Sequence, residues 1–267
     1  MEKNLGRFKN NTAVITGAGS GIGRSIALRF AEEGADIGLI DVNAQGLEET
    51  AEMVQALSRK AVICRCDMSK ISDIGAAVKV FLNEFEKIDI LVNGAGIGDT
   101  NAAYEDLEPE LWDKVYGVNV KGPFFLIQKI AKQMADNGIK GRIINIASTE
   151  GKTNRGGSIA YASSKSALIG LTQGLAIQLA PYEITVNNVC PGLINTPIWH
   201  RGDKSLDLPK GSTIKMVVDT SIESRQLKIM RVGEPEEIAA AVAFLASTDA
   251  DYMTGQAMNV CGGLEFH

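Results

Sequence analysis

The feature that most constrains the fold is the regular alternation of short apolar segments with amphipathic ones along the chain. Seven segments have the length and apolar character of strands, at residues 12–16, 35–41, 61–66, 88–92, 142–147, 185–189 and 257–260. Helical patterns occupy residues 22–33, 43–57, 71–86, 108–116, 120–137, 159–179 and 234–247. Strands separated by helices of ten or more residues form parallel βαβ units. With right-handed crossovers, this order predicts a doubly wound α/β fold, a parallel seven-stranded Rossmann sheet with helices on both faces.

The length of the chain favours a single domain. Its 267 residues fit one large α/β unit, so we expect one Rossmann domain over residues 1–267. The stretch from 195 to 233 shows no regular pattern, and a connection of that length in a compact domain is usually functional. We interpret it as a lid over a substrate site beyond the carboxyl ends of the strands, where ligands bind in such sheets.

Composition excludes several classes of function. The net charge of −5 argues against nucleic acid or an anionic membrane as the main partner. No apolar run approaches the roughly 20 residues of a membrane span, and residues 1–11 lack an apolar signal core, so we expect a cytoplasmic protein. The four cysteines, at positions 64, 66, 190 and 261, fit small buried apolar residues better than a metal site, and no metal is expected.

A glycine-rich turn at residues 17–23 indicates a phosphate site. It reads Gly-Ala-Gly-Ser-Gly-Ile-Gly, follows an apolar strand and opens a helix. Glycines allow the backbone to approach a pyrophosphate, and the N-terminus of the helix supplies N–H donors. The spacing differs from Gly-x-Gly-x-x-Gly, so the strand–turn–helix context carries the interpretation. The residues expected to contact the cofactor here are Gly17, Ser20, Gly21, Ile22 and Gly23.

Acidic residues at the ends of the next two strands indicate which dinucleotide binds. Asp41 ends the second strand, 18 residues after Gly23, where a carboxylate accepts both ribose hydroxyls of NAD and repels a 2′-phosphate. Arg24 is the one cation close to the turn that argues the other way. Asp67 and Met68 end the third strand, where an adenine would lie. We therefore expect NAD as the cofactor.

Tyr161 and Lys165 are the central chemical feature. Their spacing of four residues places them on one face of a helix. The charge of Lys165, with the positive nicotinamide of the oxidised cofactor, is expected to lower the pKa of the phenol, which is near 10 in free tyrosine. Tyr161 can then act as a general base on an alcohol or a general acid on a carbonyl. Ser148, at the end of the fifth strand, can donate a hydrogen bond to the reacting oxygen.

Taken in order, these motifs resemble the short-chain dehydrogenase/reductase family over nearly the whole chain. The residues that carry the resemblance are Thr16-Gly17-x-x-x-Gly21-x-Gly23, Asn93-Gly94-Ala95-Gly96, Asn119, Ser148, Tyr161-x-x-x-Lys165 and Pro191-Gly192. The family more often has Asn-Asn-Ala-Gly at the fourth strand, so Gly94 is a mild departure.

The resemblance implies roles for these positions. Ser148, Tyr161 and Lys165 would be catalytic, Asn119 would support a proton relay through water, and Lys165 would also hold the nicotinamide ribose. The segment Asn93, Gly94 and Ala95 would line the adenine ribose. The nicotinamide carboxamide would be framed by Pro191, Gly192, Ile194 and Thr196. Family members usually form homotetramers through their two long central helices and their last strand.

Three further segments are similar to the branch of acetoin reductases and polyol dehydrogenases. They are residues 115–122, 190–199 and 251–256. This likeness implies a secondary alcohol on a small polyol, sugar alcohol or vicinal diol. Alternatives on the same scaffold are a hydroxysteroid dehydrogenase and a 3-oxoacyl reductase. More remote is an NAD-binding regulatory protein that has lost turnover.

The substrate pocket is expected to include the polar residues after Ser148. Such a segment suits a small polar molecule better than a steroid or an acyl chain. We expect Glu150 and Asn154 to bind substrate hydroxyls, with Lys152 and Arg155 available to a phosphate or sulfonate, although all four can also simply face solvent. Trp199 and His200 are expected to close over the substrate or to pack within the lid.

Overall fold

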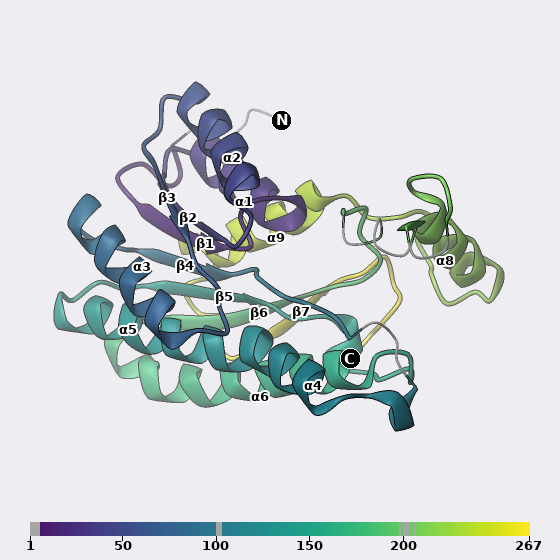
Figure 1. The fold of residues 1–267 in the computed structure, drawn as a ribbon. Helices are drawn as coiled ribbons and strands as arrows, with labels where there is room; N and C mark the ends of the chain where they lie inside the picture. Colours follow the sequence, from purple (N-terminus) through teal and green to yellow (C-terminus); the bar gives the residue numbers. More distant parts are fainter. Residues whose placement is uncertain (1–5, 100–102, 198, 200–202, 205–206) are drawn as a thin grey trace.

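Seven parallel strands form one sheet in the order β3-β2-β1-β4-β5-β6-β7 (Figure 1). A computed structural model describes residues 6–99, 103–197, 199, 203–204 and 207–267. The strands are β1 (Thr12–Thr16), β2 (Asp36–Asp41), β3 (Ala61–Arg65), β4 (Ile90–Asn93), β5 (Arg142–Ile146), β6 (Thr185–Pro191) and β7 (Ala257–Val260). The order reverses between β1 and β4, so the predicted doubly wound α/β fold is confirmed.

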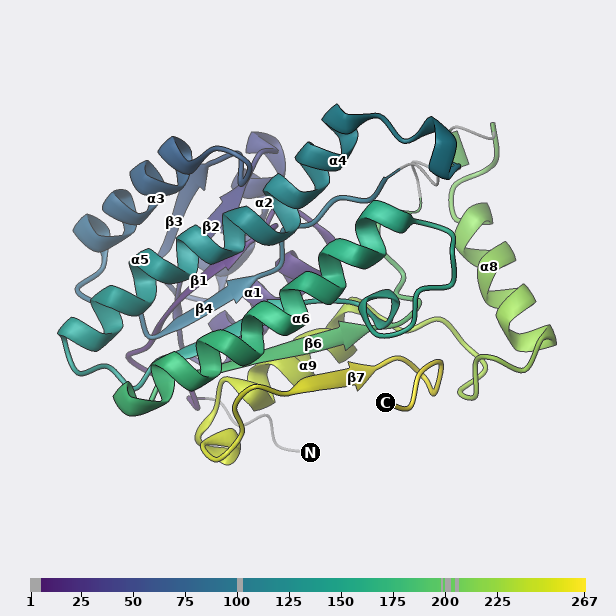
Figure 2. The same cartoon turned by 90° about the horizontal axis from the view of Figure 1, so that it is seen from below.

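Helices cover both faces of the sheet (Figures 1 and 2). One layer consists of α1 (Gly21–Glu32), α2 (Ala44–Ala56) and α9 (Pro235–Leu245). The opposite layer consists of α3 (Ile71–Glu84), α4 (Pro109–Tyr116), α5 (Gly122–Asp136) and α6 (Ile159–Leu179). Apart from both layers, α8 (Ser212–Glu223) lies beyond the carboxyl ends of β6 and β7. Among the described residues, no helix combines the length and apolar character needed to cross a membrane.

The central strand β1 shows why the core has two halves. All five of its residues are buried, as expected for a strand covered on both faces. Ala13 and Ile15 belong to the apolar cluster under α1, α2 and α9, whereas Val14 belongs to the cluster under α3, α5 and α6. Successive side chains of a strand point to opposite faces, so one strand supplies both clusters.

Two features differ from the sequence-based expectation. The helices α4 and α5 are joined by a π-helical turn, Gly117–Lys121, where we expected a break. Within the stretch from 195 to 233, which we expected to be irregular, residues Ser212–Glu223 form α8. Asp203 supports this helix, because its carboxylate accepts hydrogen bonds from the N–H groups of Gly211 and Thr213, both at 2.7 Å. Because Asp203 lies outside the helix and the sequence of residues 212–223 has only a weak helical pattern, α8 was not predicted.

Candidate active site

The glycine-rich turn follows β1 and leads directly into α1. Gly17 and Gly21 have φ values of 72° and 52°, a region that other residues rarely adopt. At Gly23, a Cβ atom would lie 2.1 Å from the carbonyl oxygen of Gly17, so only glycine lets the helix pack this closely on the turn. Ser20 is the N-cap residue of α1, and its side chain makes no capping hydrogen bond within the described chain. The first-turn N–H groups are therefore available to a phosphate, which this cradle fits.

Asp41 lies against the glycine-rich turn. Its Oδ2 accepts a hydrogen bond from the N–H of Gly19 at 3.0 Å, and its Oδ1 accepts one from Asn43 at 2.9 Å. The carboxylate at the end of β2 is thus held beside the cradle before any ligand arrives. This is the position from which it can accept ribose hydroxyls.

Arg24, the one cation that argued against NAD, is engaged within the protein. Its Nη2 donates to the carbonyl of Gly19 at 2.6 Å and to Oε2 of Glu49 at 2.8 Å. Its Nε donates to the hydroxyl of Thr50 at 2.9 Å. The hydrogen bond from Arg24 lowers the pKa of Glu49, whose negative charge is thereby secured. Arg24 cross-links the turn to α2, which supports NAD rather than a cofactor with a 2′-phosphate.

Three residues expected to contact the adenosine part of the cofactor have side chains that contact other parts of the protein. Asp67 accepts hydrogen bonds from the N–H and the hydroxyl of Ser69, at 3.0 and 2.7 Å, which lowers its pKa and caps the turn after β3. Met68 is 3% exposed and packs in the core. Asn93 is 1% exposed, and its Nδ2 donates to Oδ1 of Asn145 at 2.8 Å. Because the side chains of Met68 and Asn93 point inward, these two residues can meet a cofactor only through their backbone.

The neighbouring backbone at Gly94 and Ala95 is held by β1. Both N–H groups donate to the hydroxyl of Thr16, at 3.1 and 3.0 Å. A Cβ atom on Gly94 would lie 2.7 Å from the carbonyl oxygen of Thr16, so the glycine that departs from the family pattern is required by this close approach.

Lys165 is buried beneath the carboxyl end of β5. The residue is 3% exposed, and its ammonium group donates to the carbonyl of Ile146 at 2.7 Å. Burial lowers the pKa of Lys165 to about 8, because desolvation disfavours the charged form. Tyr161 lies one turn earlier in α6, and the Lys165 Nζ atom is 5.6 Å from the centre of its ring.

Tyr161 and Ser148 come together as the sequence predicts, since their side chains are hydrogen-bonded. Ser148 is buried at the end of β5, and its Oγ also accepts the N–H of Glu150 at 3.1 Å. In the protein without ligands, the pKa of Tyr161 is shifted upward, opposite to the direction expected with the oxidised cofactor bound. Burial of the phenol raises the pKa, and the charges of Glu150 and Cys190 add to the effect, while the hydrogen bond with Ser148 opposes it.

Asn119 sits in the π-helical turn and is fully buried. Its Oδ1 accepts the N–H of Ile97 at 2.9 Å, and its Nδ2 donates to the carbonyl of Ile97 at 2.9 Å and to Oγ of Ser164 at 2.9 Å. The wider turn puts this amide between the segment after β4 and helix α6. Short π-helical turns within α-helices are frequent at functional sites.

The polar residues Glu150, Lys152, Asn154 and Arg155 after Ser148 all have partners within the protein. Glu150 pairs with Arg155 at 2.7 Å, and Arg155 also pairs with Glu265 at 3.2 Å. Lys152 donates to the carbonyl of Ala257 at 2.6 Å. Asn154 accepts the N–H of Gly156 at 2.7 Å. A substrate would have to displace these partners, so the expected roles of Glu150 and Asn154 in hydroxyl binding gain no support from the geometry.

Residues after β6 connect the expected lid to the cofactor cradle. A Cβ atom on Gly21 would meet the side chain of Thr196 at 3.5 Å, so this threonine faces the turn. Ile194 is buried and bridges to Gly233. The indole of Trp199 donates to the carbonyl of Ile194 at 2.9 Å, and its ring packs against the apolar cluster of Ile214, Val218 and Leu227. Trp199 therefore packs within the segment expected to form the lid, and His200 lies outside the described residues.

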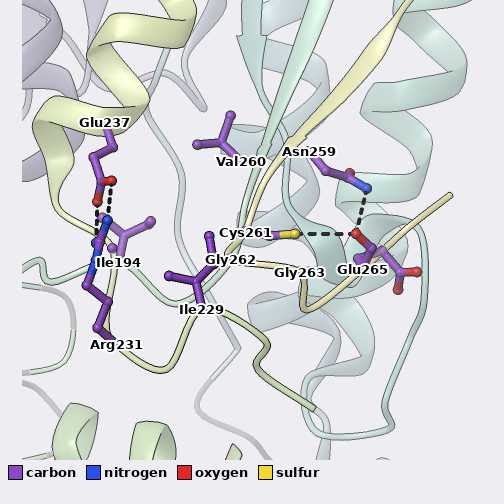
Figure 3. A pocket seen from close by; sticks show the side chains of 11 residues that line it. Ile194, Ile229, Arg231, Glu237, Asn259, Val260, Cys261, Gly262, Gly263 and Glu265 are labelled. Atoms are coloured by element: carbon purple, nitrogen blue, oxygen red, sulfur yellow. Dashed lines mark hydrogen bonds and ion pairs between the residues drawn. The ribbon is translucent and has the colours of Figure 1, made fainter. Parts of the chain in front are cut away.

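A cavity of about 350 Å³ lies at the end of β7 rather than at Tyr161 (Figure 3). It is lined by Ile194, Ile229, Arg231, Gly233, Glu237, Asn259, Val260, Cys261, Gly262, Gly263 and Glu265. Its charged wall is already neutralised, because Arg231 binds both carboxylate oxygens of Glu237 at 2.7 Å and lowers the pKa of that carboxyl to about 2. None of the expected catalytic residues lines it.

Two residues near Tyr161 were not predicted to belong to the site. Cys190, expected only as a small buried residue, is a buried free thiol near the end of β6, and burial raises its pKa. Asp99 is a buried carboxylate whose Oδ2 accepts the N–H groups of Ala160 and Tyr161 at 2.7 and 3.2 Å. No local pattern could reveal Asp99, because its partners lie about sixty residues later in the chain.

Comparison with known proteins assigns the family. The model of the short chain dehydrogenases matches residues 11–206, so the chain belongs to this family of oxidoreductases. The (2S)-[(R)-hydroxy(phenyl)methyl]succinyl-CoA dehydrogenase subunit of Thauera aromatica is 37% identical over 96% of this chain and 97% of that protein. A diacetyl reductase of Staphylococcus epidermidis that forms (S)-acetoin is 36% identical over 96% of this chain and 99% of that protein.

Solved structures agree with this assignment. The structure of a NAD⁺-bound xylitol dehydrogenase superposes with a TM-score of 0.88 at 33% identity, covering 96% of this chain and 99% of that one. Relatives that act on acetoin and xylitol confirm the resemblance to the acetoin and polyol branch. NAD as the expected cofactor is confirmed at the level of the family.

Proposed function

We propose that this protein is an NAD-dependent dehydrogenase that interconverts a secondary alcohol and a ketone on a small polyol, sugar alcohol or vicinal diol. The observation that carries the proposal is the meeting of Ser148, Tyr161 and Lys165 at the carboxyl edge of the sheet, beside the glycine cradle. The likeness to proteins that act on acetoin and xylitol supports the substrate class.

Residues from the glycine-rich turn, from the end of β2, from α6 and from the segment after β6 would hold the cofactor. The turn from Gly17 to Gly23 would bind the pyrophosphate, and Asp41 would accept the adenosine ribose hydroxyls. Lys165 would bind the nicotinamide ribose, and the segment of Pro191, Gly192, Ile194 and Thr196 would frame the carboxamide. When bound, oxidised NAD accepts the hydride that leaves the alcohol carbon.

The protein's own groups would handle the proton. Ser148 would donate a hydrogen bond to the reacting oxygen and hold it at the phenol of Tyr161. In oxidation, the deprotonated Tyr161 would take the hydroxyl proton, and in reduction it would return a proton to the carbonyl oxygen. With the cofactor bound, the ammonium of Lys165 would stabilise the negative charge on the deprotonated phenol of Tyr161. Asn119, held by Ile97 and Ser164, would support the relay of the proton through water.

The expected domain and assembly are part of the proposal. Residues 1–267 would act as one NAD-binding domain, with residues 195–233 as the substrate lid. We propose a cytoplasmic homotetramer. Ile214 and Val218 of α8 form an apolar cluster with Leu227, which follows the helix, and Trp199 packs against this cluster. The proposed lid therefore has a small core of its own.

A second candidate is a hydroxyacyl or 3-oxoacyl thioester reductase. The observation that favours it is the 37% identity to a dehydrogenase subunit whose substrate is a coenzyme A thioester. Both candidates use the same proton and hydride chemistry, so they differ only in the pocket.

A spectrophotometric screen with NAD at mildly alkaline pH tests both candidates. The panel consists of hexitols, pentitols, glycerol, butane-2,3-diol and their phosphorylated relatives, with a bile acid and an acetoacyl thioester as comparisons. Formation of NADH with a polyol or diol supports the leading proposal. Turnover of the thioester alone moves the assignment to the second candidate, and no turnover of any member contradicts both.

A further inference from the structure

Asp99 is a buried charge that the proposed reaction does not use. The residue is 3% exposed, whereas Gly98 before it is exposed. Its Oδ2 accepts the N–H of Ala160 at 2.7 Å and that of Tyr161 at 3.2 Å. Its Oδ1 is buried and, among the described residues, has no hydrogen-bond partner. Asp99 thus caps the first turn of α6, but burying a carboxylate oxygen without a hydrogen-bond partner is unfavourable, so this capping carries a cost.

The segment that carries Asp99 is fixed at its other end by Asn119. The Asn119 amide binds both the N–H and the carbonyl of Ile97, each at 2.9 Å. Only Gly98 separates this clamp from Asp99, so the carboxylate has little freedom to move. The segment from Ile97 to Asp99 therefore ties the π-helical turn to the first turn of α6.

The side-chain amide of Asn119 is also linked, through Ser164, to the carbonyl of Tyr161. Asn119 Nδ2 donates to Oγ of Ser164 at 2.9 Å, and that hydroxyl donates to the carbonyl of Tyr161 at 2.7 Å. A closed ring thus runs from the N–H of Tyr161 through Asp99, Ile97, Asn119 and Ser164 to the carbonyl of Tyr161. Both peptide groups of the proposed acid–base residue are held by one network.

We propose that Asp99 is a positioning residue, which fixes the backbone of Tyr161 so that its phenol meets the reacting oxygen. This inference rests on the proposed role of Tyr161 in hydride-coupled proton transfer. A carboxylate suits the task, because negative charge near a helix N-terminus is stabilised by the helix dipole. Misplacing a catalytic group by about 1 Å can reduce the rate roughly 100-fold. A gain of that size outweighs the cost of an oxygen that has no partner among the described residues.

Substitutions at Asp99 test the proposal. Asp99→Ala leaves the N–H groups of Ala160 and Tyr161 without a partner, and we expect kcat to fall by about 10–100-fold with little change in the KM for NAD. Asp99→Asn keeps an oxygen that accepts both N–H groups, so we expect kcat to recover to within about 5-fold of the original. Asp89→Asn is the matched control, since Asp89 is a buried carboxylate that accepts a backbone N–H from Thr12 at 2.8 Å, at the opposite edge of the sheet.

A Tyr161→Phe background separates positioning from simple stabilisation of α6. If Asp99 acts through the phenol, Asp99→Ala reduces turnover in the original protein but not the residual turnover of Tyr161→Phe. A purely structural role predicts the same loss in both backgrounds, and that result would overturn the proposal.

A titration without substrate keeps the test independent of the proposed function. The near-ultraviolet absorbance difference between each protein and its Tyr161→Phe counterpart reports the phenol alone. The groups that face this phenol are Lys165 on its own helix, Ser148 and Glu150 after β5, and Cys190 at the end of β6. We expect Asp99→Ala to move the titration toward that of free tyrosine as the turn loosens, and Asp89→Asn to leave it unchanged. An unchanged titration in Asp99→Ala contradicts the proposal even where every substrate in the screen fails.

Discussion

The ammonium nitrogen of Lys165 lies over the ring of Tyr161, 5.6 Å from its centre, and donates its hydrogen bond to the carbonyl of Ile146. In the protein without ligands, the Lys165 ammonium is therefore bound to a carbonyl group instead of the phenol hydroxyl. Burial raises the pKa of the Tyr161 phenol. A general base must be deprotonated, and below its pKa the deprotonated fraction grows about tenfold per pH unit. We predict that kcat/KM for alcohol oxidation rises with pH between about 7 and 10. Initial rates across this range measure it, and a flat profile would contradict the role of Tyr161.

Removing the phenol is expected to abolish most turnover. Tyr161→Phe deletes the hydroxyl that carries the proton, and general acid–base catalysis typically contributes about 10²–10⁴-fold. Binding of NADH, measured by its fluorescence, should stay close to that of the original protein. Tyr182→Phe, at a tyrosine that is 53% exposed, is the control and should keep full activity. Full activity of Tyr161→Phe would remove Tyr161 from the mechanism.

The low pKa of Lys165 predicts a stability that depends on pH. Its pKa is about 8 in the folded protein and about 10.4 in an unfolded chain, so between these values the unfolded state binds more protons. The free energy of unfolding therefore rises with pH in this window, as the cost of burying the charged ammonium disappears. The full difference is roughly 3 kcal/mol.

Lys165→Met lacks this ionisation and serves as the reference. We expect the stability of the original protein to rise relative to Lys165→Met between pH 7 and 10, measured by urea unfolding at both values. If the difference between the two proteins is the same at pH 7 and pH 10, Lys165 is not the buried cation that the structure describes.

Much of the fold follows from local pattern. The strand at Thr12–Thr16 and the helix at Ile159–Leu179 have the predicted limits, because apolar runs and a proline after the helix mark them. The meeting of Ser148 with Tyr161 also follows, since motifs at the carboxyl ends of parallel strands share one edge of the sheet. Sequence order and strand polarity suffice for that inference.

Other features depend on tertiary contacts that no local pattern encodes. The side chain of Asn93, a residue expected at the cofactor, turns inward because Asn145 on the adjacent strand offers its amide oxygen, and this orientation was not predicted. The π-helical turn around Asn119 was missed, since two glycines within a few residues favour a break rather than a wider turn. The raised pKa of Tyr161 in the protein without ligands was not predicted, because desolvation depends on the surrounding packing, which helical spacing does not reveal.

Replacing Asp41 should weaken the preference for NAD over NADP. The carboxylate beside Gly19 would repel a 2′-phosphate, while Arg24 stays bound to Glu49 and does not attract one. We expect Asp41→Ala to reduce the ratio of kcat/KM for NAD to that for NADP by at least about 10-fold. Asp36→Ala, at the opposite end of β2 in a pair with Arg59, is the control and should leave the ratio unchanged. An unaltered ratio in Asp41→Ala would show that another residue selects the cofactor.

Gly23→Ala should damage the cofactor cradle directly. The added Cβ atom would lie 2.1 Å from the carbonyl oxygen of Gly17 and 3.1 Å from the nitrogen of Ala18, and both are backbone atoms. Helix α1 must then move away from the turn, which misaligns the N–H groups that would bind the pyrophosphate. We expect the Kd for NADH to increase at least about 10-fold, with a loss of stability of about 1–3 kcal/mol from overpacking.

Gly75→Ala in α3 distinguishes this clash from a general effect of alanine. Its added Cβ atom would meet only the end of the Lys129 side chain, at 4.0 Å. Glycine within a helix is less favourable than alanine, so this control should gain about 0.5–1 kcal/mol and bind NADH unchanged. Thermal unfolding and NADH fluorescence on the two variants measure both effects. If Gly23→Ala binds NADH as tightly as Gly75→Ala does, the close packing of α1 on the turn is not what shapes the cofactor site.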